Sequence, residues 1–153
     1  FFADLIASNG VGVVTPTAFS EFVHVLVRAK YRDEYGRMTA LDRSTKYASP
    51  IKGGADLYKQ DPTILQAFLP DLERFRRLLV ASGLLFVSPW NLGPIASGRR
   101  YDEELVHLVG IYGLDSGDAA ILLEAQQLGL TDIVSLDADL QRAQADFTIY
   151  TWS

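Results

Sequence analysis

The most informative stretch of the sequence is Leu114–Asp139, which reads LDSGDAAILLEAQQLGLTDIVSLDAD. Its first half is typical of a helix, because residues 119–125 are all alanine, leucine, isoleucine or glutamate, which are apolar or good helix formers. Gly129 follows at the point where a helix commonly ends in a left-handed residue. The largely apolar run at 133–136 is then typical of a short buried strand of a parallel sheet. The stretch therefore predicts a helix, a tight link and a parallel strand.

Acidic residues stand at both exposed ends of this helix–strand unit. Asp115 and Asp118 open the helix with the spacing of a capping box, in which Asp replaces the usual Glu. Asp137 and Asp139 follow the strand, at the edge where open α/β sheets bind ligands. We therefore expect Asp118 and Asp137 to face the same crevice. Position alone also allows Asp115 to be a helix cap and Asp118 a first-turn acid that favours the helix dipole.

Three further apolar runs predict strands at 11–14, 84–87 and 147–151. The segments between the strands have helical spacing, and we expect helices at 15–27, 61–68, 70–82, 99–112 and 138–145. Because parallel neighbours need crossover connections, short strands that alternate with helices predict a parallel α/β sheet. The apolar residues at 1–8 are typical of the end of a helix, so we expect another strand upstream of them.

Length and composition fit one domain over residues 1–153, with 48% hydrophobic residues to build a core. The sequence has no apolar run of about 18 residues, which a membrane-spanning helix needs, and no signal-peptide pattern. We therefore expect a cytoplasmic protein without a membrane partner. The sequence lacks cysteine and has two histidines, His24 and His107. This excludes disulfides and thiolate metal sites and argues against a multi-histidine zinc centre.

The net charge of −5 hides an uneven distribution along the chain. Residues 101–139 include nine acids and no Lys or Arg, whereas residues 28–59 include eight bases against four acids. The first segment predicts a site that needs cations, and the second a surface that can hold a polyanion. Within it, Arg28, Lys30 and Arg32 are the bases that we expect to contact nucleic acid. The alternative for this segment is a helix end followed by a solvated surface loop.

Three acids are predicted at the carboxyl ends of strands, namely Glu21, Asp118 and Asp137. Carboxylates that gather without a cation raise one another's pKa. Mg²⁺ or Mn²⁺ with oxygen ligands removes this conflict, and such an ion can activate water and neutralise a phosphodiester. The alternative for Glu21 is an acid near the start of a helix that stabilises the helix dipole. The P-loop, G-x-S-x-G and H-E-x-x-H motifs are missing from the sequence.

Three short motifs carry a resemblance to a known family. They are VVTPTAFSE at 13–21, YGL at 112–114 with Asp118-Ala119, and IVSLD at 133–137 with Asp139. These motifs resemble the segments that bear the second, third and fourth acids of PIN domains, a family of metal-dependent nucleases. The resemblance implies a three-layer α/β/α fold around a short central parallel sheet. The family's first acid follows its first strand in a motif that this sequence lacks. Asp4 is a poor substitute, so that strand is expected upstream.

The resemblance also assigns roles to the acids. It implies that Glu21, Asp118 and Asp137 are catalytic metal ligands and that Asp139 is a further ligand. Asp115 and Ser135 are secondary candidates. The implied activity is a Mg²⁺- or Mn²⁺-dependent endoribonuclease that hydrolyses RNA phosphodiester bonds, either alone or as the toxin of a toxin–antitoxin pair. A homodimer and an antitoxin partner follow from the resemblance alone.

Two alternatives to a nuclease stand beside it. A catalytically impaired PIN scaffold that binds RNA or a partner protein would explain the missing first acid. A phosphotransfer domain would explain Asp137-Ala138-Asp139 after a strand. Against it, Leu140 does not fit the phosphatase motif of the haloacid dehalogenase-like family, and a response-regulator receiver needs a lysine after Lys59, where the sequence has none.

Overall fold

A computed structural model describes residues 10–151. The chain divides into two compact units, which we call the strand unit (Phe1–Phe19 with Leu85–Ser153) and the helical unit (Ser20–Leu84). The single domain expected over residues 1–153 stays a prediction. The helix end expected at 1–8, with Asp4, lies outside the described residues, as does Trp152.

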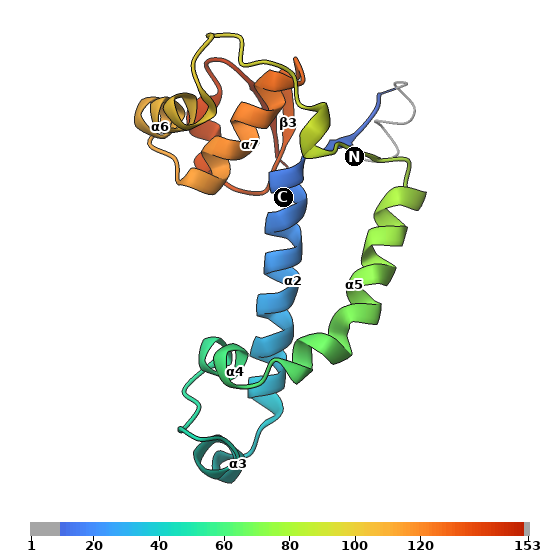
Figure 1. The fold of residues 1–153 in the computed structure, drawn as a ribbon, viewed down its shortest axis with the longest axis vertical. Helices are drawn as coiled ribbons and strands as arrows, with labels where there is room; N and C mark the ends of the chain where they lie inside the picture. The colour runs from blue at the N-terminus through green and yellow to red at the C-terminus, as the bar shows by residue number, and fades with distance from the viewer. Residues whose placement is uncertain (1–9, 152–153) are drawn as a thin grey trace. The chain divides into compact units, whose positions relative to one another are not determined.

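In the described part of the strand unit, four short strands form two parallel pairs (Figure 1). β1 (Val13–Val14) pairs with β2 (Leu85–Phe86), and β3 (Asp132–Val134) pairs with β4 (Thr148–Tyr150). The predicted α/β class with short parallel strands is therefore confirmed. Hydrogen bonds between strands of residues 10–151 join only these two pairs, so the single central sheet and its three-layer arrangement stay predictions.

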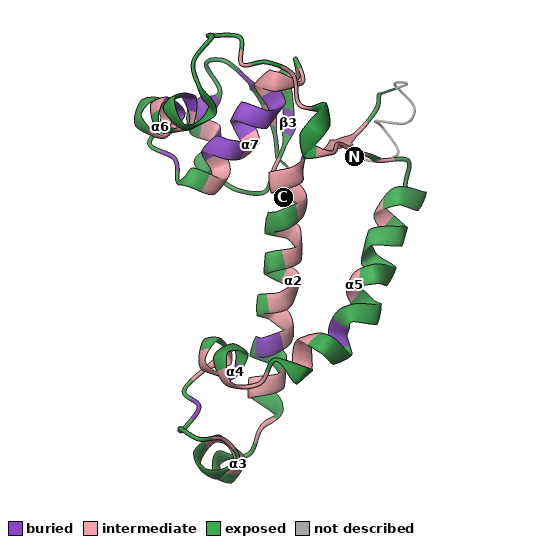
Figure 2. Cartoon of the chain, viewed as in Figure 1, coloured by how far each residue is buried: buried purple, intermediate pink, exposed green. Residues whose placement is uncertain are grey.

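The core of the strand unit gathers around one helix. α7 (Ser116–Gln127) packs against α6 (Tyr101–Tyr112), and Figure 2 shows α7 as extensively buried. As predicted, Gly129 is left-handed, with φ of +68°. The buried core residues are Leu108, Leu114, Ala119, Leu122, Leu123, Ala125, Ile133, Leu140, Ala143 and Phe147. In the part of the chain that the structure describes, no single helix is long and apolar enough to span a membrane. α6 and α7 together are long and apolar enough, but the chain bends by 114° at the break between the two helices.

The described part of the strand unit also contains two short 3₁₀ helices. η1 (Pro89–Asn91) follows β2. η2 (Asp139–Ala143) replaces the helix expected at 138–145, and it buries Leu140 and Ala143 against the core. The observed 3₁₀ turn is therefore shorter and tighter than the predicted helix, and Asp139 is its first residue.

The helical unit contains the part of α2 (Pro16–Arg37) from Ser20 onward, with α3 (Ala40–Thr45), α4 (Gly54–Gln60) and α5 (Thr63–Ala81). Its buried residues are Tyr31, Ile51, Leu57 and Phe68. The helix predicted at 15–27 is too short, because α2 continues for ten residues to Arg37. The break predicted at Pro70 is also wrong, because α5 is continuous. Pro70 is exposed, so water can bond the carbonyl that its missing N–H leaves unpaired.

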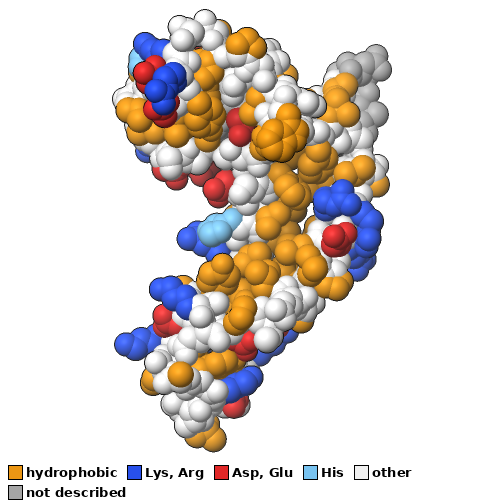
Figure 3. All heavy atoms as spheres, viewed as in Figure 1, with side chains coloured by type: hydrophobic (Ala, Val, Ile, Leu, Met, Phe, Trp, Pro, Cys, Tyr) orange, Lys and Arg blue, Asp and Glu red, His pale blue; other side chains and the backbone are white. Residues whose placement is uncertain are grey.

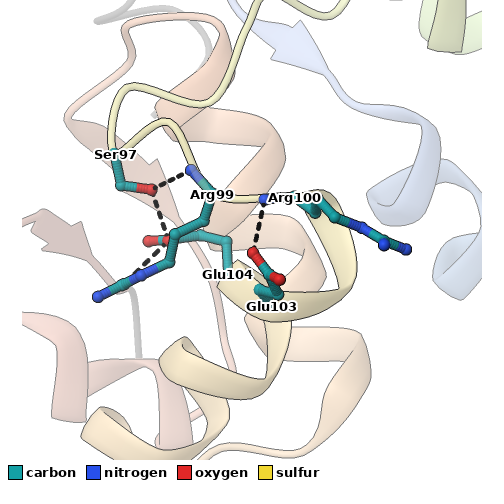
Figure 4. Close-up of polar contacts among 5 residues, drawn as sticks. All are labelled: Ser97, Arg99, Arg100, Glu103 and Glu104. Carbon is teal, nitrogen blue, oxygen red and sulfur yellow. Dashed lines mark hydrogen bonds and ion pairs between the residues drawn. The ribbon is translucent and has the colours of Figure 1, made fainter.

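A buried carboxylate joins the loop before α6 to that helix (Figure 4). Glu104 is only 5% exposed, whereas Asp102 and Glu103 beside it are exposed. Its Oε2 accepts hydrogen bonds from the Ser97 hydroxyl at 2.7 Å and from Arg99 Nη1 at 3.1 Å. The bond from Ser97, followed by that from Arg99, holds the pKa of Glu104 below its usual value despite burial.

This lowered pKa predicts an acid-dependent loss of stability. Because the folded-state pKa lies below the unfolded value, the carboxylate stabilises the fold above about pH 4.5, and this contribution is lost as the pH falls through the folded value. Glu104→Gln should therefore lower the free energy of unfolding at pH 7 and bring it closer to that of the wild type near pH 3. Urea denaturation across this range measures the difference. A gap between the two proteins that does not change with pH would contradict the assignment.

Candidate metal centre

The end of β3 places two of the predicted acids in successive turns. The Ser135 N–H donates to the Tyr150 carbonyl at 3.0 Å and extends the β3–β4 pairing by one residue. The Asp137 N–H then donates to Ser135 Oγ at 2.9 Å. The Asp139 N–H donates to Asp137 Oδ1 at 2.9 Å. Ser135 therefore positions the turn, while Asp137 Oδ2 is left without a hydrogen-bond partner in the range 10–151.

The start of α7 places the third acid. Asp115 Oδ1 accepts from the N–H groups of Gly117 at 2.8 Å and Asp118 at 2.9 Å, so its predicted role as N-cap is confirmed. Asp118 lies in the first turn, where the helix dipole favours a negative charge. The cap thus fixes the helix start and, with it, the position of the Asp118 carboxylate.

Three carboxylates meet where these two segments come together. One oxygen from each of Asp118, Asp137 and Asp139 lies within 4.8 Å of the other two. Asp118 is partly buried, whereas Asp137 and Asp139 are exposed. The structure therefore brings Asp118 and Asp137 together, as the sequence predicts, and Asp139, which the resemblance implies as a further ligand, lies with them. We call these three residues the acidic triad.

One acid of the triad forms an ion pair with a nearby arginine. Arg142 Nη2 lies 2.8 Å from Asp139 Oδ1, and Arg142 Nη1 donates to the Gly113 carbonyl. Hard oxygen donors of this kind suit Mg²⁺ or Mn²⁺. The triad can therefore hold a divalent metal ion, and Asp139 is shared between that role and its ion pair with Arg142.

The other predicted site residues have different positions. Glu21 belongs to the helical unit, where it is exposed on α2, so its role as a ligand stays a prediction. Arg28 and Arg32 are exposed on the same helix. Lys30 is engaged instead, because its Nζ lies 2.7 Å from Glu34 Oε1 and 5.6 Å from the centre of the Phe68 ring.

Sequence reasoning missed a buried carboxylate on α7. Glu124 is 4% exposed, and its oxygens accept from the Thr17 N–H at 2.9 Å and from the Thr17 hydroxyl at 2.7 Å. These bonds join α7 to the first turn of α2. The available signal was its place directly after Ile121-Leu122-Leu123, on a helix with apolar residues on every side.

The two roles proposed for Asp115 can be separated by two substitutions. Asp115→Ala should lower the free energy of unfolding by about 1 kcal/mol, whereas Asp115→Asn should change it by a few tenths, because asparagine caps helices equally well. Urea denaturation measures both. If Asp115→Asn is as stable as the wild type and binds Mn²⁺ with the same affinity, Asp115 acts as a cap alone. A stable Asp115→Asn with weaker Mn²⁺ binding would show that its charge is needed at the centre.

The three carboxylates of the acidic triad are therefore able to bind a hard cation. Comparisons of the chain with models of protein families, with curated proteins and with solved structures found no match.

Proposed function

We propose that this chain is a Mg²⁺- or Mn²⁺-dependent endoribonuclease that hydrolyses RNA phosphodiester bonds, with the arrangement of acids that its motifs share with PIN domains. One observation carries the proposal: the oxygens of Asp118, Asp137 and Asp139 lie within 4.8 Å of one another. These residues come from two segments whose ends were expected to meet, so the cluster agrees with the motif pattern.

The protein's own groups would prepare this centre in three ways. Asp118 and Asp137 would hold the ion, and the Asp139 N–H would fix the direction of the Asp137 carboxylate. The amino end of α7 would favour the negative charge of Asp118. When bound, the ion would supply a Lewis acid that lowers the pKa of a water molecule and neutralises a phosphodiester. Glu21 remains a proposed additional ligand on the strength of the resemblance.

RNA is proposed as the substrate because the chain combines this acidic centre with a basic segment at 28–59. A homodimer and an antitoxin partner belong to the same proposal, and they rest on the family resemblance alone.

A catalytically impaired scaffold is the second candidate, and one contact favours it. The ion pair of Asp139 with Arg142 already uses one of the three carboxylates. If this pair persists in solution, Asp139 is not available to the ion, and RNA binding without cleavage would result.

Cleavage of a mixed-sequence single-stranded RNA separates the two candidates. We expect cleavage with Mn²⁺ or Mg²⁺, its loss in EDTA, and its recovery when an excess of Mn²⁺ is restored. Cleavage that persists in EDTA would contradict the metal-dependent mechanism. RNA binding without cleavage under any of these conditions would support the scaffold.

A further inference from the structure

A pocket of about 680 Å³ lies within the helical unit, in the size range of small-ligand sites. Its walls come from α2, α4 and the first turn of α5. Gly54 permits the close approach of α4 to α2, because a Cβ at this position would lie 3.0 Å from the backbone nitrogen of Arg32. Over this part of the chain, Figure 3 shows basic and histidine side chains beside hydrophobic ones.

The α2 wall of the pocket carries two adjacent stripes, and within each stripe the residues are four positions apart in the sequence. One stripe is apolar and consists of Val23, Val27 and Tyr31; the other consists of His24, Arg28 and Arg32. Residues at this spacing share one face of a helix. Lys59 adds a further cation from α4, and none of the lining residues is acidic. The pocket therefore combines an apolar floor with a cationic edge.

The cations at this edge differ from the other bases of α2 in their ion pairs. Arg28, Arg32 and Lys59 form no ion pair with any residue in the range 10–151. By contrast, the other two bases of α2, Lys30 and Arg37, both pair with Glu34, at 2.7 and 3.2 Å. The side of α2 that faces the pocket thus keeps its positive charge for an external anion.

An exposed aromatic ring lines the same pocket, and its contact with a buried ring fixes its orientation. Tyr58 is 53% exposed, and its ring meets that of Tyr31 edge-on, with 5.2 Å between centroids and 90° between planes. Tyr31 is only 2% exposed, and its hydroxyl donates to the Asp61 carbonyl at 2.9 Å. A buried and hydrogen-bonded neighbour therefore holds the Tyr58 ring as a platform on which a planar group can stack.

We propose that this pocket binds single-stranded RNA, with a base stacked on Tyr58 and the adjoining phosphates on Arg28, Arg32 and Lys59. The choice of RNA rests on the proposed function, whereas the pocket is lined by residues of the helical unit alone and by none of the acidic triad. Base stacking beside a positively charged groove is how proteins hold single strands without reading their sequence. An acidic peptide would use the cations but would gain little from the aromatic platform, so the pair of features favours a nucleotide. Lys30, which the sequence included among the RNA contacts, is not part of this site.

Fluorescence anisotropy with a labelled 12-nucleotide single-stranded RNA tests the cationic edge in EDTA, where no cleavage interferes. The test variant is Arg28→Gln/Arg32→Gln, and the control is Arg76→Gln/Arg77→Gln, which removes two exposed charges from α5 of the same unit, outside the pocket and outside the basic segment at 28–59. For two lost phosphate contacts, the test variant should reduce the slope of log Kd against log salt by about 1.4, and the control should leave the slope near the wild-type value. Equal losses in both variants would overturn the site, because charge alone would then explain binding.

The aromatic platform is tested separately. Tyr58→Ala should weaken binding by roughly 5- to 150-fold, the range for loss of one stacked base, whereas Tyr58→Phe should bind within about twofold of the wild type. Circular dichroism checks that both variants are folded. Wild-type affinity in a folded Tyr58→Ala protein would overturn the proposal. A second result would also overturn the proposal: poly-glutamate displaces the labelled RNA at the same concentration as unlabelled RNA does. An acidic peptide would then occupy the pocket as well as RNA.

Parallel cleavage assays with Mn²⁺ distinguish failure of this site from failure of the nuclease. If the protein binds RNA through Tyr58 and Arg28 but never cleaves it, the pocket stands and the nuclease fails. If the protein cleaves RNA while all pocket variants bind normally, the nuclease stands and the pocket is overturned.

Discussion

Asp137→Asn is expected to lower the rate of Mn²⁺-dependent RNA cleavage by about 100-fold or more. Loss of a residue that merely supports a metal ligand already costs about 10- to 100-fold in affinity or activity, and Asp137 is proposed as a ligand itself. The neutral amide keeps the Oδ1 acceptor for the Asp139 N–H, so the turn should survive the substitution. Initial rates at saturating Mn²⁺, with circular dichroism to check folding, measure the effect.

Asp132→Asn is the matched control for this experiment. Asp132 is exposed on β3, and its Oδ1 accepts from the Tyr150 hydroxyl at 3.2 Å, but it does not belong to the acidic triad. We expect its cleavage rate to stay within about twofold of the wild type, as for a surface change away from the site. Equal loss in the two variants would show that net charge, rather than the triad, governs activity.

Glu124→Ala is expected to destabilise the protein by about 3 kcal/mol. The substitution removes two hydrogen bonds to a charged acceptor and leaves the Thr17 N–H and hydroxyl without their partner, at about 1–3 kcal/mol for each such group. It also leaves a cavity beside the buried core of α7. Chemical denaturation at pH 7 measures the change. Glu124→Gln should lose less, because its amide oxygen can still accept one of the two bonds.

Glu103→Ala is the control, because it removes a glutamate that is exposed instead of buried. Glu103 is exposed on α6, and its Oε2 accepts from the Arg100 N–H at 3.1 Å. Its loss should cost less than about 1 kcal/mol, since water can replace the bond. If Glu103→Ala and Glu124→Ala are equally destabilised, the contact between Glu124 and Thr17 is not a main contribution to the stability of the strand unit.

The elements that the sequence predicts well are those whose signals are local. The start of α7, the Asp115 cap and the left-handed Gly129 each depend on residues within one or two helical turns. The approach of Asp118 to Asp137 also follows from local order, because a helix start and the end of the next strand lie at the same edge of a parallel α/β unit.

The features that sequence reasoning missed depend on distant partners. Glu104 and Glu124 look like surface acids until the structure supplies Ser97 and Thr17 as donors. The pairing of strands also joins residues far apart in the chain, and no local pattern specifies which strands become neighbours.

The helix boundaries that were wrong have a different cause. The last ten residues of α2 are rich in Arg, Tyr, Asp and Glu, so they lack the apolar spacing on which the prediction relied. Their charges are instead arranged by face, with Arg28 and Arg32 toward the pocket and Lys30 toward Glu34. A search for charge periodicity would have extended the helix.

The acidic triad is expected to bind a divalent cation, and isothermal titration of the protein with Mn²⁺ measures this binding without reference to RNA. The wild type and Asp132→Asn should bind Mn²⁺ with the same affinity, and Asp118→Asn/Asp137→Asn should give no binding heat over the same concentrations. Wild-type affinity in the folded double variant would contradict the account, as would the absence of Mn²⁺ binding by the wild type.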